Sequence, residues 1–472
     1  MDVLRAKLTA IREKRLHAIS AFYGKTETLL SEHAEDRQFA QRVRTFSQDA
    51  AGDILYALNI ISTIRDAAIV VHGAAGCAVS RFVTDLSEVD EVKWAITNLN
   101  ERDSIMGSDA KLREAVIQIN KLHQPKIIFI VSTPVVAINN DDIESVVEEL
   151  KDELGIAIIP IYSDGFRSKI GTTGYDLVSH SIIKQLLPPQ GTEKLGFANL
   201  ISVSEKADDI KELHWLLNEI GLKTNIFPRY TALANIRNAK KASFSIAINP
   251  DEANYPGTAL ENRFQIPYIQ SVLPIGIGNT AKWLTEIAIA TGRETEAREL
   301  IAKEKARLLE SLGKNRTVRK KAFVSLPPAQ AIAITGLLEE LGFDYVGLRL
   351  AYIDEQHIDF LNKLQETRPD FQLLIGDGQL FEEENVIRKL EPDLYIGNGG
   401  DFAVAIRNGI PVVNLENVSI LGFSGAANFA EKTRKVLLNS SFTELLSQRE
   451  TKSYTKEWLK KSTNWFIKQE VK

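Results

Sequence analysis

Short apolar segments alternate with amphipathic segments along most of this chain, and no other sequence feature constrains the fold as strongly. A run of about five Val, Ile, Leu and Ala residues fits a buried strand, whereas apolar residues at three- and four-residue spacing fit a helix. Strands that alternate with helices predict parallel sheets flanked by helices. We therefore expect an α/β protein of three Rossmann-like domains, plus an N-terminal helical extension.

The predicted strands form three successive sets. They comprise residues 67–72, 126–132 and 156–162, then 195–203, 244–248 and 266–271, and finally 322–326, 345–350, 371–376, 394–397 and 411–414. The predicted helices lie between them, near 109–123, 142–154, 206–220, 280–312, 329–341, 355–366, 382–390 and 401–408.

These sets predict four regions, in keeping with a length of 472 residues and about 150 residues for a domain. Residues 1–45 carry Leu and Ile at helical spacing and form the expected helical extension, packed on its own domain or on a partner. The first Rossmann-like domain spans 46–190 and ends at a Pro- and Gly-containing break. The second spans 191–313, and the third spans 314–472 with a C-terminal helical segment.

Composition excludes several classes of partner. A net charge of −5 gives no electrostatic reason to bind nucleic acid or an anionic membrane, and the basic run at 314–321 fits a solvated linker. No apolar run approaches the ~20 residues that a membrane helix needs. The N-terminus lacks the apolar core of an export signal, and a single cysteine suits a reducing compartment, so we expect a cytoplasmic protein.

That single cysteine, Cys77, lies in a glycine-rich turn after the strand predicted at 67–72. Gly73 and Gly76 would let the backbone turn sharply or approach a ligand closely. A thiol near the start of a helix has a lowered pKa, but from spacing alone a small buried cysteine that packs the turn is the simpler interpretation. An iron–sulfur cluster normally takes four thiolates. Either another chain supplies the missing ligands, or the architecture persists without its cluster.

The other turns give weaker signals. Residues 97–103 and 106–109 form a loop followed by a helix cap, and Asp141 and Asp142 open a helix in a way that usually serves its dipole. The glycine-rich turns at 376–378 and 397–401 match neither GxGxxG nor a P-loop. The histidines show no zinc spacing, and no GxSxG nucleophile motif occurs. The sequence therefore identifies no catalytic residue.

Taken in order, the turns carry a family resemblance. The motifs are residues 72–77 (HGAAGC), 97–103 (TNLNERD), 106–112 (MGSDAKL), 131–133 (VST), 141–143 (DDI), 171–176 (GTTGYD), 409–411 (GIP) and 422–425 (GFSG). Together they resemble the component 1 family of nitrogenase-like oxidoreductases over about residues 46–435. That family includes the molybdenum–iron protein subunits, cofactor-assembly scaffolds and nitrogenase-like tetrapyrrole reductases.

The departures from the family pattern concern metal ligands. The resemblance implies three cysteines per chain for an iron–sulfur cluster at the subunit interface, and Cys77 matches the middle one. The first position falls near 46–48 and the third at Pro134 or Val135, none of which is cysteine. The cofactor cysteine position falls at about Asn249, and residues 414–419 lack the expected histidine.

These matches imply specific expectations. Cys77 would be an interface iron–sulfur ligand, with the cluster shared with a partner chain. Gly73, Gly76 and Asn249 would be cofactor-pocket positions, and no molybdenum–iron-type cofactor is expected on this chain. The partners would be a sister component 1-like subunit, in a homo- or heterodimer or a tetramer, and an iron-protein-like reductase that alone binds ATP.

Three functions stay open at this point. The chain could be a subunit of a nitrogenase-like oxidoreductase complex that receives electrons from that reductase. It could instead be a scaffold or assembly protein for a metal cofactor, or a non-catalytic structural subunit without a cluster. The sequence leaves the substrate open.

Overall fold

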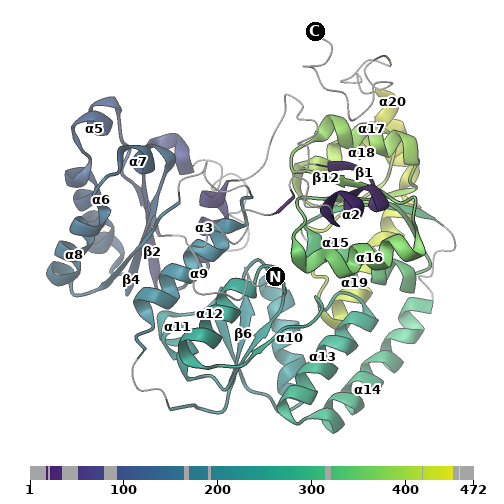
Figure 1. The fold of residues 1–472 in the computed structure, drawn as a ribbon, viewed down its shortest axis with the longest axis horizontal. Coiled ribbons are helices and arrows are strands. Elements are labelled where there is room, and N and C mark those ends of the chain that lie inside the picture. The colour runs from purple at the N-terminus through teal and green to yellow at the C-terminus, as the bar shows by residue number, and fades with distance from the viewer. Residues whose placement is uncertain are drawn as a thin grey trace. The chain divides into compact units, whose positions relative to one another are not determined.

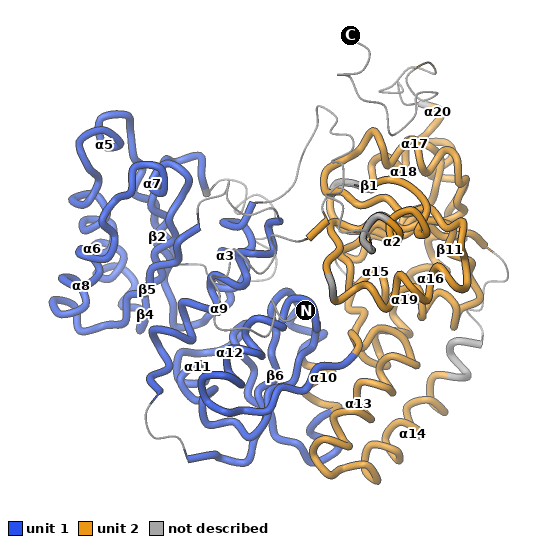
Figure 2. Tube along the Cα trace, in the orientation of Figure 1, with its two compact units in different colours: residues 1–17, 51–210, 217–271 blue, residues 18–50, 211–216, 272–472 orange. Residues whose placement is uncertain are grey.

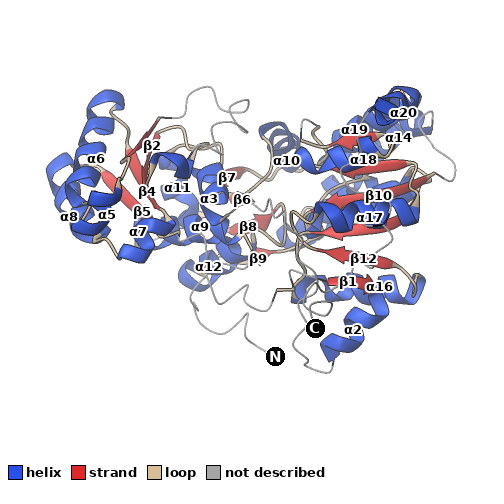
Figure 3. Cartoon of the chain, turned by 90° about the horizontal axis from the view of Figure 1, so that it is seen from above, coloured by secondary structure: helices blue, strands red, loops and turns tan. Residues whose placement is uncertain are grey.

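A computed structural model describes residues 18–19, 22–34, 52–78, 93–163, 170–189, 193–313, 320–416, 418–449 and 457. Within these residues, three largely parallel sheets are flanked by helices, which confirms the expected α/β class (Figures 1 and 3). The chain divides into two compact units (Figure 2). Unit 1 comprises residues 1–17, 51–210 and 217–271, and unit 2 comprises 18–50, 211–216 and 272–472.

The first sheet of unit 1 has the strand order β3-β2-β4-β5, with every pair parallel. Its strands are β2 (Ala67–His72), β3 (Trp94–Ile96), β4 (Ile127–Ser132) and β5 (Ala157–Ile161). Because side chains alternate along a strand, Ala68 and Val70 pack with α6 (Asp109–His123) and α8 (Ile143–Leu154). Ile69 and Val71 belong instead to the core that includes α3 (Asp53–Ile61) and α9 (Thr173–Leu186). Helices on both faces explain why β2 and β4 are buried along their whole length and apolar up to their last residues, His72 and Ser132.

The second sheet of unit 1 has the order β7-β6-β8-β9 and is also parallel. Its strands are β6 (Ala198–Ser202), β7 (Thr224–Pro228), β8 (Phe244–Ala247) and β9 (Tyr268–Ile269). The accompanying helices are α10 (Ala207–Glu219), α11 (Leu233–Asn238) and α12 (Asn254–Phe264).

Unit 2 contains the third sheet, of order β1-β12-β11-β10-β13-β14. The strands are β1 (Phe22–Lys25), β10 (Lys321–Leu326), β11 (Asp344–Leu350), β12 (Gln372–Ile375), β13 (Leu394–Gly397) and β14 (Val412–Asn414). All of them are parallel except β1, which pairs antiparallel with β12. Its helices are α2 (Thr26–Ala34), α13 (Ile277–Thr291), α14 (Glu294–Gly313), α15 (Pro328–Glu340), α16 (Ile358–Thr367), α17 (Leu380–Leu390), α18 (Ala403–Arg407), α19 (Gly422–Leu438) and α20 (Ser440–Arg449).

Two sequence predictions are wrong in detail. The helix expected over 1–45 is replaced at 22–25 by strand β1, because aromatic residues and Gly24 suit an edge strand better than a helix. Residues 1–17 and 35–51 lie outside the described part of the chain. The single helix expected near 280–312 is two helices, since Gly292 ends α13 with a φ of 67°.

Each sheet falls within one of the predicted regions 46–190, 191–313 and 314–472, apart from β1. The boundaries between those regions stay a prediction, because the two compact units group the first and second sheets together. No helix among the described residues is both long enough and apolar enough to cross a bilayer.

Candidate functional site

The turn that carries Cys77 lies at the carboxyl edge of the first sheet, where parallel sheets usually bind ligands. Gly73 follows β2, and the short 3₁₀ helix η1 (Ala75–Ala78) holds Cys77. The Cys77 backbone N–H donates to the Ala74 carbonyl at 3.0 Å, which closes the turn. The Cys77 residue is partly exposed and makes no disulfide. The thiol is therefore placed where a ligand or a partner can reach it.

The two glycines of this turn have different structural requirements. A Cβ atom on Gly73 would lie 2.3 Å from Thr133 Oγ1, and the Thr133 hydroxyl donates to the His72 carbonyl at 2.8 Å. Gly73 is thus fixed by the close approach of the loop after β4. Gly76 is exposed, and an added Cβ would meet nothing within 4 Å. The neighbouring structure therefore does not require glycine at position 76.

His72 is the centre of a buried polar network at the same edge. Its Nδ1 lies 3.1 Å from Thr97 Oγ1 and its Nε2 lies 3.1 Å from Ser108 Oγ. The Ser108 hydroxyl in turn donates to the Asp141 carboxylate, which lies 3.5 Å from His72 Nε2. Burial lowers the His72 pKa to about 4, although Asp141 opposes that shift. The imidazole is therefore neutral near pH 7.

The sequence predicts that Ser108 and Asp141 serve helix ends, and the structure gives them a different role. Ser108 stands at the N-cap of α6 but makes no side-chain cap hydrogen bond, because its hydroxyl turns to His72 and Asp141. Asp142 is the residue that caps α8, accepting from the Ser145 backbone N–H at 3.1 Å. The only sequence signal for the network was the shared order of the motifs, since Thr97 and Ser108 lie 25 and 36 residues from His72 and Asp141 lies farther still.

An open depression of about 960 Å³ lies beside the Cys77 turn. It is lined by Ala74, by Val135 and by residues of α5 (Glu101–Met106), a helix that begins with a capping box at Asn100. Pro134 opens the neighbouring helix α7 (Pro134–Asn139). The predicted third ligand position therefore lies at this edge, occupied by side chains that cannot bind a metal. Residues 46–48, the predicted first position, lie outside the described residues.

Exposed apolar side chains surround the same edge. Ile105 and Met106 on α5 are 81% and 75% exposed, and Ile138 on α7 is 71% exposed. Water-exposed apolar side chains that gather in one place are characteristic of surfaces covered by another protein.

Asn249 lies elsewhere, at the carboxyl edge of the second sheet. It is buried, and its Oδ1 accepts from the Asp251 backbone N–H at 3.1 Å. Its carbonyl accepts from the Ala253 N–H at 2.9 Å, so the residue shapes the turn before α12. The predicted pocket positions thus divide between two sheets, with Gly73 and Gly76 at the first and Asn249 at the second.

Sequence reasoning missed buried charged groups near Asn249. Glu205 accepts from the Val203 N–H at 2.7 Å, and burial raises the pKa of its carboxyl group. Arg229, also buried, donates from Nη1 to the Glu205 carbonyl at 2.9 Å. These groups stabilise the strand ends of the second sheet.

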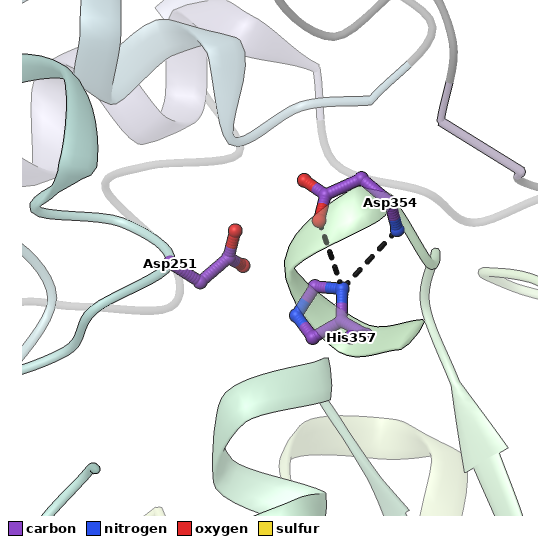
Figure 4. A group of neighbouring side chains, drawn as sticks. All are labelled: Asp251, Asp354 and His357. Atoms are coloured by element: carbon purple, nitrogen blue, oxygen red, sulfur yellow. Dashed lines mark hydrogen bonds and ion pairs between the residues drawn. The ribbon is translucent and has the colours of Figure 1, made fainter. Parts of the chain in front are cut away.

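In unit 2, the glycine-rich turns contribute side chains that are already paired. Arg349 donates to Asp377 at 2.8 Å, and Asn398 lies 3.5 Å from Gln330 Oε1. His357 is buried, with Nδ1 3.1 Å from the Asp354 backbone nitrogen and 3.0 Å from the Asp354 carboxylate (Figure 4). These contacts hold local turns.

Comparison with known proteins supplies the family context. The sequence profile described as nitrogenase component 1 type oxidoreductase matches residues 54–438. The nitrogenase iron-molybdenum cofactor biosynthesis protein NifE of Methanococcus maripaludis is 24% identical over 390 residues, covering 80% of each chain. The nitrogenase molybdenum-iron protein alpha chain of the same species is 24% identical over 413 residues, covering 81% of this chain and 85% of its own.

A solved structure of nitrogenase Cp1 at pH 5 superimposes with a TM-score of 0.74 at 18% identity. The match covers 95% of this chain and 99% of the other. At this identity the likeness establishes the fold.

Proposed function

Because this chain belongs to the nitrogenase component 1 type oxidoreductase family, we propose that it is one subunit of a nitrogenase-like oxidoreductase complex. An iron–sulfur cluster would lie between Cys77 and a sister chain, and an ATP-dependent iron-protein-like reductase would supply electrons. The observation that carries the proposal is the placement of the one thiol of the chain. Cys77 is accessible at a sheet edge beside exposed apolar side chains of the kind that a partner covers.

The donor set at this edge determines how such a cluster could be held. Cys77 offers one thiolate, Pro134 and Val135 offer none, and both His72 ring nitrogens are engaged by hydroxyl groups. Since such clusters normally take four thiolates, this chain fits only as a minor contributor. A sister chain would have to supply the remaining ligands. Once bound, the cluster would store and pass on single electrons.

The residues around Cys77 would position this cluster ligand and would take no part in the electron transfer themselves. The closed turn at Ala74 and the glycine at position 73 fix the backbone that carries Cys77, and the apolar side chains on α5 and α7 would exclude water once a partner covers them. An obligate interface of this kind buries well over ~2,000 Å². We therefore expect a dimeric core, made with a second copy or with a sister chain.

The decisive experiment is anaerobic co-expression of this chain with a sister component 1-like subunit. We expect a stable complex that contains iron and gives an iron–sulfur EPR signal. Cys77→Ser should reduce both, whereas Ala75→Ser, an equally small change at an exposed position on the same turn, should not. An iron-free complex whose properties are unchanged by Cys77→Ser would refute the cluster and leave the structural-subunit alternative.

The second candidate function is a scaffold that assembles or carries a metal cofactor. It is favoured by the likeness to the cofactor biosynthesis proteins named NifE, of which the Clostridium pasteurianum protein is 26% identical over 393 residues. A scaffold should release its cluster to an apo-enzyme, whereas an electron-transfer subunit should retain it during reduction. Transfer measured by activation of the apo-enzyme therefore separates the two functions.

A further inference from the structure

The buried groups around His72 form one continuous chain of hydrogen bonds. The Gly73 backbone N–H donates to Thr97 Oγ1 at 2.9 Å, and Thr97 Oγ1 lies 3.1 Å from His72 Nδ1. His72 Nε2 then lies 3.1 Å from Ser108 Oγ, whose hydroxyl donates to Asp141. The members come from four separate segments of the polypeptide. The hydrogen bonds therefore link the segments after β2 and β3 to those before α6 and α8.

The direction of each proton follows from the available donors. If Ser108 gives its single hydroxyl proton to the Asp141 carboxylate, its oxygen must accept from His72 Nε2–H. A neutral imidazole with its proton on Nε2 has an accepting Nδ1. It takes the Thr97 hydroxyl proton at 3.1 Å in preference to the Gly73 carbonyl, which lies farther from Thr97 Oγ1, at 3.3 Å. Every short contact then carries one proton, and Thr97 Oγ1 remains free to accept from the Gly73 N–H. The opposite tautomer would require a protonated Asp141.

These hydrogen bonds include the residue that begins the turn carrying Cys77. Gly73 receives a hydrogen bond at its carbonyl from the Leu99 N–H at 3.0 Å and gives one from its own N–H to Thr97. The N–H and the carbonyl of Gly73, where the turn begins, are therefore both hydrogen-bonded to the loop after β3. The Thr133 hydroxyl adds a third bond at the His72 carbonyl, at 2.8 Å. A buried network with all members satisfied makes such a turn rigid.

We propose that Thr97 is a positioning residue for Cys77, acting through a one-directional hydrogen-bonded chain that runs from Gly73 through Thr97, His72 and Ser108 to Asp141. The hydroxyl of Thr97, rather than its methyl group, is the required part. The importance of Cys77 placement rests on the proposed function, but the chain of hydrogen bonds can be tested on the metal-free protein. A failure here is thus distinguishable from the absence of a cluster.

A matched pair of substitutions separates hydrogen bonding from packing. Thr97→Val keeps the shape and loses the hydroxyl, whereas Thr97→Ser keeps the hydroxyl and loses a methyl group. Because this chain has one cysteine, the reaction rate with a neutral aromatic disulfide reports only on Cys77. We expect Thr97→Val to change that rate by about tenfold, since a buried N–H is left unpaired, and Thr97→Ser to stay within about twofold of wild type.

Ser108→Ala tests the series of hydrogen bonds at the end that is remote from Gly73, and Ser104→Ala is its control. Ser104 lies at the same edge, but its hydroxyl donates to the Asn100 carbonyl of its own helix at 3.1 Å. We expect Ser108→Ala to change the Cys77 rate as Thr97→Val does, and Ser104→Ala to leave it unchanged. The proposal would be overturned if the Cys77 reaction rate changed in Thr97→Ser, which loses only the methyl group, and stayed the same in Thr97→Val, which loses the hydroxyl.

The wild-type protein provides a direct readout of the His72 tautomer, and a variant is needed only to assign the signals. Long-range ¹H–¹⁵N NMR of histidine-labelled protein, with the His72 signals assigned by their loss in His72→Gln, should show the proton on Nε2. A proton on Nδ1, or an imidazole that is charged near pH 7, would refute the proposed direction of the chain.

Discussion

Gly73→Ala is the substitution whose effect the structure defines most sharply. The new methyl group would lie 2.3 Å from Thr133 Oγ1, 2.6 Å from its Cγ2 and 2.9 Å from its Cβ. Overpacking of a close contact costs about 1–3 kcal/mol, and displacement of Thr133 would break its 2.8 Å hydrogen bond to the His72 carbonyl, worth about 1 kcal/mol. We expect the free energy of unfolding to fall by about 2–4 kcal/mol.

The assay is urea unfolding followed by far-ultraviolet circular dichroism, which reports the loss of helices and strands and does not depend on the accessible Cys77 thiol. Gly76→Ala is the matched control on the same turn and should change stability by no more than about 0.5 kcal/mol. Adding Thr133→Ala to Gly73→Ala should recover part of the loss, with a coupling of about 1 kcal/mol or more. Equal effects of Gly73→Ala and Gly76→Ala would refute the reasoning.

Three further predictions concern helix contacts and buried titratable groups. Gly174→Ala would place a methyl group 2.1 Å from the Asp53 carbonyl and should lower thermal stability strongly. Gly336→Ala, in the middle of α15, meets only an ordinary contact at 3.5 Å with the Asn279 side chain of α13 and should raise stability by up to about 1 kcal/mol in calorimetry. Between pH 6.5 and 4 the unfolded chain binds more protons at His72 than the folded chain, so the folded state should lose up to about 3 kcal/mol as pH falls through that window. Parallel pH–stability curves for wild type and His72→Gln would contradict that. Burial raises the pKa of Glu205 above its ordinary 4.5, so the folded state binds more protons there than the unfolded state and loses stability as pH rises from 4.5. Glu205→Gln should flatten that decline of stability with pH in urea titrations. An unchanged slope would count against the prediction.

The sequence predicted the buried parallel strands well because their signal is local. Strands such as β2 and β4 are apolar in all but their last residue, and the helices between them carry clear periodicity. The second strand of the second sheet, β7, was missed, since Thr224 and Asn225 give it only a short apolar run. Strand β1 was misassigned because its pairing with β12 depends on a partner far along the chain.

The candidate site shows the same limit. Gly73 and Cys77 could be placed at a strand-end turn from sequence alone, because a strand, a glycine and a helix start follow each other directly. The hydrogen bonds of His72 to Thr97 and Ser108 could not be derived, since the partners are 25 and 36 residues away. Because serine is a preferred N-cap residue, the sequence suggested that Ser108 caps α6. Only the tertiary structure shows that its hydroxyl contacts His72 and Asp141 instead.

The antiparallel strand β1 has a consequence for how the protein is made. Thr26, the residue directly after it, hydrogen-bonds to Phe371, which is 345 residues later in the chain. At about 5–20 residues per second, a ribosome needs on the order of 20–70 seconds to synthesise that stretch. Residues 51–210 of unit 1 emerge entirely within the interval. The first strand of unit 2 therefore stays without its partner strand β12 while most of unit 1 is synthesised, and its Phe22 and Tyr23 side chains lack their place in the sheet for that time.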